Sequence, residues 1–501
     1  MIRTRFPVIG ILLAVFFSVC ILVSCARKRN ETAGTVTELR YGVTSEPATL
    51  DPLSPSNTAD GKSILFNVFE GLVRPDTGGM IQPCIADSLK VDEQRIIYTF
   101  RLRDNVKFHD GSVLTSKDVA FSLNTAVAVD LPGFGAVARV ETEGDYGIRV
   151  VLKSPDPDFL PYLTVGIVKA DSTERDKKAV GTGPYYIESY NVQQSLVLKK
   201  FDDYWRDGVP YLEKITIVFF ADSDAIALGL HGGSVDGALL PGSQAQQLSQ
   251  TSFDLTPGYS AMVQLLALNN DVAPFNDVLV RQAFNYGIDI RGIIDTAFYG
   301  KGEPSGSPLI PGLTQYYDKS LADPYPYNPE KARSLLLEAG QQNLSVEITV
   351  PSNFTMHVDT AQVIASQLKK IGVTANIRLV DWATWLSDVY GKRHYQATII
   401  SLDSPVVSPR GFLSRYRSDS HDNFINFSNA DYDRVYDSIF VTDDEDGRIA
   451  LYKKAQTIIS QNAASVYIQD ILGFKAFRAG AYGGILNYPL YVIDFASMHG
   501  R

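Results

Sequence analysis

The chain has 501 residues, of which 45% are hydrophobic and 20% charged, and its formal net charge is −10. This length is too great for a single hydrophobic core and predicts two or three domains. The acidic charge excludes a nucleic-acid partner, because binding to phosphates requires clustered Lys and Arg side chains.

The chain begins with a candidate secretion signal. Arg3 and Arg5 precede an uncharged, mostly apolar run over residues 7–24, and the tetrapeptide LVSC ends at Cys25. A basic start, an apolar segment and small residues before a cut are typical of such a signal. The tetrapeptide resembles the bacterial lipobox, which implies that residues 1–24 are removed and that Cys25 carries lipid. The alternative is an uncleaved membrane anchor, since 18 residues lie at the lower limit for spanning a bilayer.

Residues 25–37 are polar and lack a hydrophobic period, which is typical of a flexible tether between membrane and folded domain. Of the three cysteines, Cys20 leaves with the signal and Cys25 takes lipid, so Cys84 remains alone. We therefore expect no internal disulfide.

Strand and helix patterns alternate along the rest of the chain. Strands are predicted at residues 39–43, 95–103, 148–153, 215–220, 262–268, 346–350 and 375–380. Helices are predicted at residues 64–69, 278–288, 329–339, 358–370 and 431–440. Thr115 is expected to cap a further helix, with Asp118 at its third position. This mixture over the whole length indicates an α/β architecture.

The sequence lacks the signatures of a secreted hydrolase. Residues 232–236 (GGSVD) end in Asp where the G-x-S-x-G motif needs Gly, and H-E-x-x-H does not occur. The GTG run at residues 181–183 is not a nucleotide loop, because Pro184 lacks a backbone N–H and Tyr186 replaces the third glycine. We expect neither catalysis nor a cofactor.

Several local patterns occur in a consistent order between about residues 40 and 475. They are residues 86–89 (ADSL), 98–111 (YTFRLRDNVKFHDG), 115–119 (TSKDV), 181–185 (GTGPY), 204–205 (YW), 280–284 (VRQAF) and 328–332 (NPEKA). Together they resemble the signature of family 5 solute-binding proteins, the peptide and nickel-chelate receptors of ABC importers. Most of these residues also suit turns and helix starts, so they indicate the fold and leave the ligand open.

The resemblance implies an α/β, two-lobed fold of the class II periplasmic-binding-protein type, with an additional domain and a hinged cleft. The implied parts are residues 1–24 (signal), 25–37 (tether), 38–72, 182–262 and 475–501 (lobe I), 73–181 (additional domain) and 263–474 (lobe II). Together with the lipobox-like tetrapeptide, it implies a monomeric, lipid-anchored receptor outside the cytoplasmic membrane. Such a receptor would deliver a small solute, first of all a peptide, to an ABC permease. A receptor for a nickel chelate or another organic solute, a secreted hydrolase and a surface adhesin remain alternatives.

In the peptide receptors of this family, a Trp-x-x-Asp-x-x-Asp-Pro-like run supplies an aspartate that pairs with the peptide α-amine. Here Leu402, Pro405 and Ser408 occupy the Trp and Asp positions. The nearest carboxylate in the sequence is Asp403, two residues before Pro405. A buried ammonium needs a paired anion, so either Asp403 replaces the missing aspartate or the ligand is not a peptide with a free amine. Asp403 either replaces the missing anion or caps the loop before Pro405.

Five further residues are candidate ligand contacts. His421 lies in a segment similar to the nickel-chelate receptor, where the corresponding histidine binds the metal; a surface or core position is the alternative. Trp382 and Trp385, at i, i+3 spacing, suit either an aromatic pocket wall or the core. Asn57 and Thr58 follow the first strand, in the loop that faces ligand in relatives, and turn formation explains them equally well.

Overall fold

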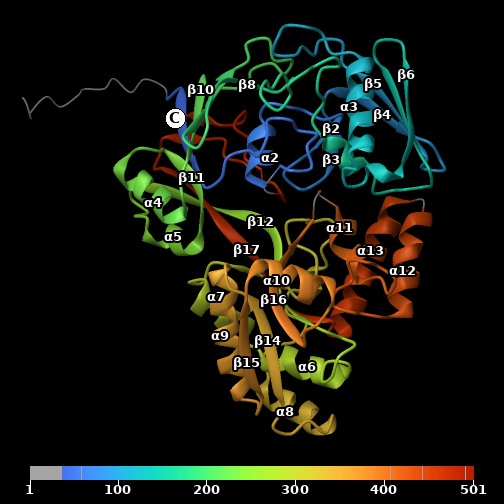
Figure 1. Ribbon diagram of the computed structural model, residues 1–501, viewed down its shortest axis with the longest axis vertical. Helices are drawn as coiled ribbons and strands as arrows, with labels where there is room; N and C mark the ends of the chain where they lie inside the picture. Colours follow the sequence, from blue (N-terminus) through green and yellow to red (C-terminus); the bar gives the residue numbers. More distant parts are fainter. Residues whose placement is uncertain (1–35, 58, 405, 407, 443, 491) are drawn as a thin grey trace, which may run out of the picture. The chain divides into compact units, whose positions relative to one another are not determined.

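The computed structural model describes residues 36–57, 59–404, 406, 408–442, 444–490 and 492–501. Residues 37–501 form one compact unit. Its largest element is a mixed sheet with the strand order β15-β14-β16-β12-β17-β11-β1-β10-β9-β8, and β13 pairs with β17 beside this path (Figure 1). The strands are β15 (Thr374–Val380), β14 (Ser345–Pro351), β16 (Ala397–Asp403), β12 (Phe253–Leu268), β17 (Ser465–Arg478), β11 (Gly237–Pro241), β1 (Glu38–Val43), β10 (Lys214–Phe219), β9 (Ser195–Lys200), β8 (Tyr185–Asn191) and β13 (Glu303–Pro304).

Two long antiparallel strands, β12 and β17, join two groups of parallel strands. In one group β1 pairs with β10 and β11, and in the other β14 pairs with β15 and β16. The register between β12 and β17 shifts between the Tyr259–Leu472 pair and the Val263–Asp470 pair. Ala261 lies in this interval with φ of +58°. A bulge of this kind bends a strand, so the two groups of parallel strands meet at a bend.

A second, antiparallel sheet has the order β4-β5-β7-β6, and α3 packs on β6 and β7. Its strands are β4 (Ala86–Val91), β5 (Ile97–Leu102), β7 (Gly147–Leu152) and β6 (Val137–Glu143). Two small pairs are β2 (Val73–Pro75) with β3 (Ile81–Pro83) and β18 (Tyr482–Gly483) with β19 (His499–Gly500). The helices are α2 (Ala59–Leu65), α3 (Ser116–Ala128), α4 (Ser223–Gly232), α5 (Gly242–Gln247), α6 (Val278–Gly287), α7 (Ile290–Ala297), α8 (Pro329–Glu338), α9 (Thr355–Lys369), α10 (Trp382–Thr384), α11 (Pro409–Leu413), α12 (Ala430–Val441) and α13 (Glu445–Gln461).

Both faces of the sheet are buried around β12. Val263 and Leu265 belong to one hydrophobic cluster, whereas Leu266 and Leu268 belong to another. Successive side chains of a strand point to opposite faces, so this alternation places one core on each side of the sheet.

Most elements predicted from the sequence are confirmed within a few residues. The predicted cap of α3 is also present, because the Asp118 carboxylate accepts hydrogen bonds of 2.8 Å from the Thr115 amide and hydroxyl. Strand β12 begins nine residues before the predicted start, since it continues through Pro257 and Gly258, which are typical of a break. The predicted domain boundaries at 262/263 and 474/475 fall inside β12 and β17, and the division into domains stays a prediction.

The predicted C-terminal end of the helix at residues 64–69 was wrong, because α2 stops at Leu65. The carbonyls of Asn67 and Val68, which would continue the helix, accept hydrogen bonds from the amides of Tyr185 and Gly183. The Asn67 side chain also bonds to the main chain of Ile493 and Phe495. Tertiary hydrogen bonds therefore end this helix.

Candidate functional site

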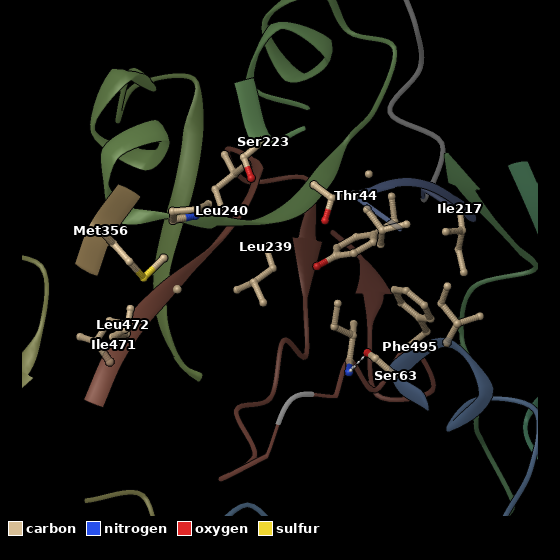
Figure 2. Close-up of a pocket in the computed structure, with 17 residues that line it drawn as sticks. Thr44, Ser63, Ile217, Ser223, Leu239, Leu240, Met356, Ile471, Leu472 and Phe495 are labelled. Carbon is tan, nitrogen blue, oxygen red and sulfur yellow. Dashed lines mark hydrogen bonds between the residues drawn. The ribbon is translucent and has the colours of Figure 1, made fainter. Parts of the chain in front are cut away.

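A cavity of about 240 Å³ lies beside the bend in the large sheet (Figure 2). Its wall includes Val43 and Leu240 at the carboxyl ends of β1 and β11, and Ser223 and Met356 in the first turns of α4 and α9. Strand β17 contributes residues 471–473, next to the register shift. Open α/β sheets bind ligands at the carboxyl ends of parallel strands, so this position favours a ligand site.

The wall of this cavity is mainly aliphatic and aromatic. Among the described residues that line it there is no Asp, Glu, Lys, Arg or His, and its side-chain hydroxyls come from Tyr41, Thr44, Ser63 and Ser223. The Ser63 Oγ accepts a hydrogen bond of 3.1 Å from the Ile493 amide, which anchors the segment behind it (Figure 2). The cavity therefore offers contact surface and hydroxyl groups to a ligand, without a side chain for an ion pair.

Sequence reasoning missed these lining residues. Val43 and Leu240 look like ordinary ends of apolar strands, and Met356 looks like one apolar residue of an amphipathic helix. The available signal was their position directly after strands or at helix starts, where α/β folds place ligands.

The two candidate tryptophans stack on each other next to this region. Their ring centroids lie 5.1 Å apart with an interplanar angle of 4°. Trp385 is buried, and its Nε1 donates a hydrogen bond of 2.9 Å to the Thr398 hydroxyl, so its position suits the core. Trp382 is 38% exposed, and its ring centroid lies 5.3 Å from that of Phe354 in an edge-on contact. Phe354 precedes the cavity-lining residue Met356 by two positions. Trp382 thus presents an aromatic surface to solvent.

Asp403 lies at the exposed end of β16, opposite Met262 of β12. Its main-chain carbonyl accepts a hydrogen bond of 2.9 Å from Arg415. Ser408 caps α11, because its Oγ accepts a hydrogen bond of 3.1 Å from the Arg410 amide. Ser408, which replaces an aspartate of the peptide-receptor motif, therefore has a structural role as a helix cap. The Asp403 side chain is exposed to solvent.

His421 is 98% exposed, and its Nδ1 lies 3.4 Å from a carboxylate oxygen of Asp422. In the described part of the chain, no three His, Cys, Asp or Glu side chains form a group that could hold a metal ion. Exposure and a single acidic neighbour are typical of a surface histidine.

Asn57 is buried, and its Nδ2 donates a hydrogen bond of 2.8 Å to the Asp51 carbonyl. This contact closes the loop after β1 on itself. Thr58 and Cys25 lie outside the described residues.

Two of the sequence patterns meet at a buried carboxylate. Glu70 accepts hydrogen bonds from the Tyr204 hydroxyl at 2.7 Å, the Trp205 Nε1 at 2.8 Å and the Thr182 hydroxyl at 3.2 Å. Burial raises the pKa of Glu70, and these hydrogen bonds oppose the rise. The patterns at residues 181–185 and 204–205 therefore hold the scaffold together.

The histidine of the FHDG pattern is also structural. His109 accepts a hydrogen bond at Nδ1 from the Gly181 amide, and its Nε2 lies 3.0 Å from the Gly183 carbonyl, which places the ring proton on Nε2. Burial lowers the pKa of His109 to about 4. A Cβ on Gly181 or Gly183 would overlap the main chain of Val68, so both positions require glycine.

Two aspartates in the loop after β7 contact helices α11 and α13. Arg410 of α11 pairs with Asp156, and the Tyr452 hydroxyl of α13 donates to Asp158. Burial raises the pKa of Asp158 to about 6; the Tyr452 hydrogen bond lowers it, the Asp156 charge raises it further, and Arg410 and Arg448 lower it. This contact connects the predicted additional domain with predicted lobe II.

Comparison with known proteins shows the family. Residues 80–424 match the bacterial extracellular solute-binding proteins, family 5 Middle. The chain is 28% identical over 443 residues to heme-binding protein A of Haemophilus influenzae, covering 79% of this chain and 80% of that protein. It is 27% identical over 477 residues to the glutathione-binding protein GsiB of Escherichia coli, covering 90% and 91%.

Solved structures show the same fold. HbpA2 from Haemophilus parasuis superimposes with a TM-score of 0.83 at 22% identity, over 93% of this chain and 100% of that one. The predicted α/β fold of the periplasmic-binding-protein type is thereby confirmed. Such relatives are extracytoplasmic transport receptors and not enzymes, and no described helix here has the length and apolarity to cross a bilayer. The chain belongs to the family 5 bacterial extracellular solute-binding proteins, the substrate-binding components of ABC importers.

Proposed function

We propose that this protein captures a peptide outside the cytoplasmic membrane, between its two groups of parallel strands, and delivers it unaltered to an ABC permease. The observation that carries the proposal is the position of the cavity. Its wall combines β1 and β11 with Met356 of α9 and with β17 at the bend. A solute bound there touches residues on both sides of the bend.

Such contacts couple binding to closure. A ligand that contacts both sides favours the closed arrangement in proportion to the extra contacts it makes there. The closed state is then the form that a permease recognises. Affinity near micromolar corresponds to about −8 kcal/mol, so neither covalent chemistry nor a cofactor is required.

The exposed face of Trp382 supports a peptide or another solute with flat or apolar groups. The Trp382 ring is already held by stacking on Trp385 and by its edge contact with Phe354. Binding of a ligand to this ring therefore costs little side-chain entropy. Asp403, at the exposed end of strand β16, is the carboxylate that we assign to a peptide amine. Glutathione, named for the relative GsiB, is itself a tripeptide.

We further propose that Cys25 carries the lipid that holds the receptor at the membrane. Each buried CH₂ group contributes about 0.8 kcal/mol, so two or more acyl chains give stable tethering. The polar residues 26–37 would separate the anchor from the folded unit.

Melting of the full chain in detergent tests this function. A peptide pool, glutathione and nickel complexes are each added at rising concentration, and a ligand at 100 times its Kd should stabilise the fold by about 2.7 kcal/mol. Trp382→Ala should weaken peptide binding about tenfold, since ring contacts are worth about 0.5–1.5 kcal/mol beyond area burial. Tyr211→Ala, which removes an exposed ring elsewhere, is the control. Cleavage of the peptide, or stabilisation by none of these solutes, would contradict the proposal.

A further inference from the structure

The cavity at the bend has room for one side chain but not for a whole peptide. Its volume is about 240 Å³, whereas pockets that enclose drug-sized ligands measure about 300–1,000 Å³. A dry apolar cavity of about 150 Å³ already holds a benzene molecule. A group the size of a leucine or phenylalanine side chain therefore fits, and the rest of the solute must lie outside.

The surfaces that face this space are apolar and come from separate parts of the chain. Leu239 of β11 lies between Met356 of α9 and Phe495 of the C-terminal segment (Figure 2). Ile217 of β10 and Ile471 of β17 extend the same wall. Met356 adds a flexible thioether, which adapts to side chains of different shape.

A charged group in this space would have no partner. Its neighbours among the described residues are these apolar side chains and the hydroxyls of Tyr41, Thr44, Ser63 and Ser223. An ionised carboxylate or ammonium would lose its hydration there without gaining an opposite charge, which is strongly unfavourable. An apolar group gains free energy in proportion to the area it buries.

Building on the proposed function, we infer that the receptor selects peptides that insert one bulky, uncharged, aliphatic or aromatic side chain into the cavity lined by Leu239, Met356 and Phe495. The cavity is a specificity site, and the peptide backbone and the remaining side chains lie toward Trp382 and solvent. Charged residues are rejected at the inserted position only.

A side-chain series tests this specificity. Titration calorimetry of the full chain in detergent compares tripeptides of the form glycyl-X-glycine, leucyl-X-glycine and glycyl-X-leucine, with X as leucine, phenylalanine, lysine or glutamate. In the peptide series whose residue X enters the cavity, the peptides with leucine or phenylalanine at X should bind at least about 100-fold more tightly than those with lysine or glutamate. Equal affinity for the four peptides in each of the three series would overturn the inference and leave peptide capture intact. If no peptide binds, the proposed function and the inference both fail.

Two variants place a carboxylate in the wall. Met356→Asp and Ser223→Asp each lie in the first turn of a helix, where the helix dipole tolerates an acidic residue. Both should weaken the leucine peptide at least about tenfold and reduce or reverse its advantage over the lysine peptide. Thr355→Asp, which adds the same charge to the same turn of α9 at an exposed position outside the wall, should change neither. Wild-type selectivity in both wall variants would refute the inference, and the second variant keeps the test decisive if one fails to fold.

Discussion

Replacing Arg410 by Gln should destabilise the fold by about 2 kcal/mol. Arg410 pairs with Asp156, whose side chain is only 8% exposed. Leaving a buried charge without its partner costs about 3–5 kcal/mol. Because Arg410 is itself 32% exposed, water replaces part of the lost interaction, and the value for a hydrogen bond to a charged group, about 1.5–3 kcal/mol, is the better guide.

Urea unfolding of the full chain measures this cost. Wild type, Arg410→Gln, Asp156→Asn and the double variant form a thermodynamic cycle, in which the coupling free energy should be about 1.5 kcal/mol or more. Lys107→Gln is the matched control, since Lys107 pairs with Asp203 at 2.8 Å with both side chains exposed, by 42% and 57%. Such surface pairs contribute about 0–1 kcal/mol.

The reasoning would be refuted if Arg410→Gln cost no more than Lys107→Gln. Additivity of the two single variants within about 0.5 kcal/mol would refute it as well, because residues that interact are not additive. The same four proteins also report on function. The Arg410–Asp156 contact links the predicted additional domain with predicted lobe II, so its loss should lower peptide affinity along with stability.

Two further predictions concern acid stability and the membrane anchor. The pKa of Asp158 is raised from 3.8 to about 6, so its contribution to stability is fully present below about pH 3.8 and is lost as the pH rises through about 6. Thermal melting across this window should therefore show the wild type losing up to about 3 kcal/mol relative to Asp158→Asn, and parallel curves would contradict the assignment. Cys25→Ser should abolish incorporation of a labelled fatty acid and release the protein from membranes; retained label would exclude lipid attachment at Cys25.

Local features of the molecule could be predicted from the sequence because their hydrogen bonds close within a few residues. The capping of α3 by Asp118 and Thr115 is one example. Strands β1, β14 and β15 pair with distant segments, and they could be predicted instead from their short runs of apolar and β-branched residues. The ordered sequence patterns also indicated the family, although the structure uses them for packing. Tyr204 and Trp205 bond to Glu70, more than 130 positions earlier, and no spacing rule predicts that pair.

The sequence by itself determined the α/β class, the family and the expectation of a lipid anchor, since these depend on short patterns and their order. The end of α2, the length of β12 and the cavity were decided by the tertiary structure. Tyr41, Leu239, Met356 and Phe495 line one space although more than 100 residues separate each of them from the next. Each is an ordinary apolar residue in its own segment, and only the pairing of distant strands leaves a volume between them that a solute can fill.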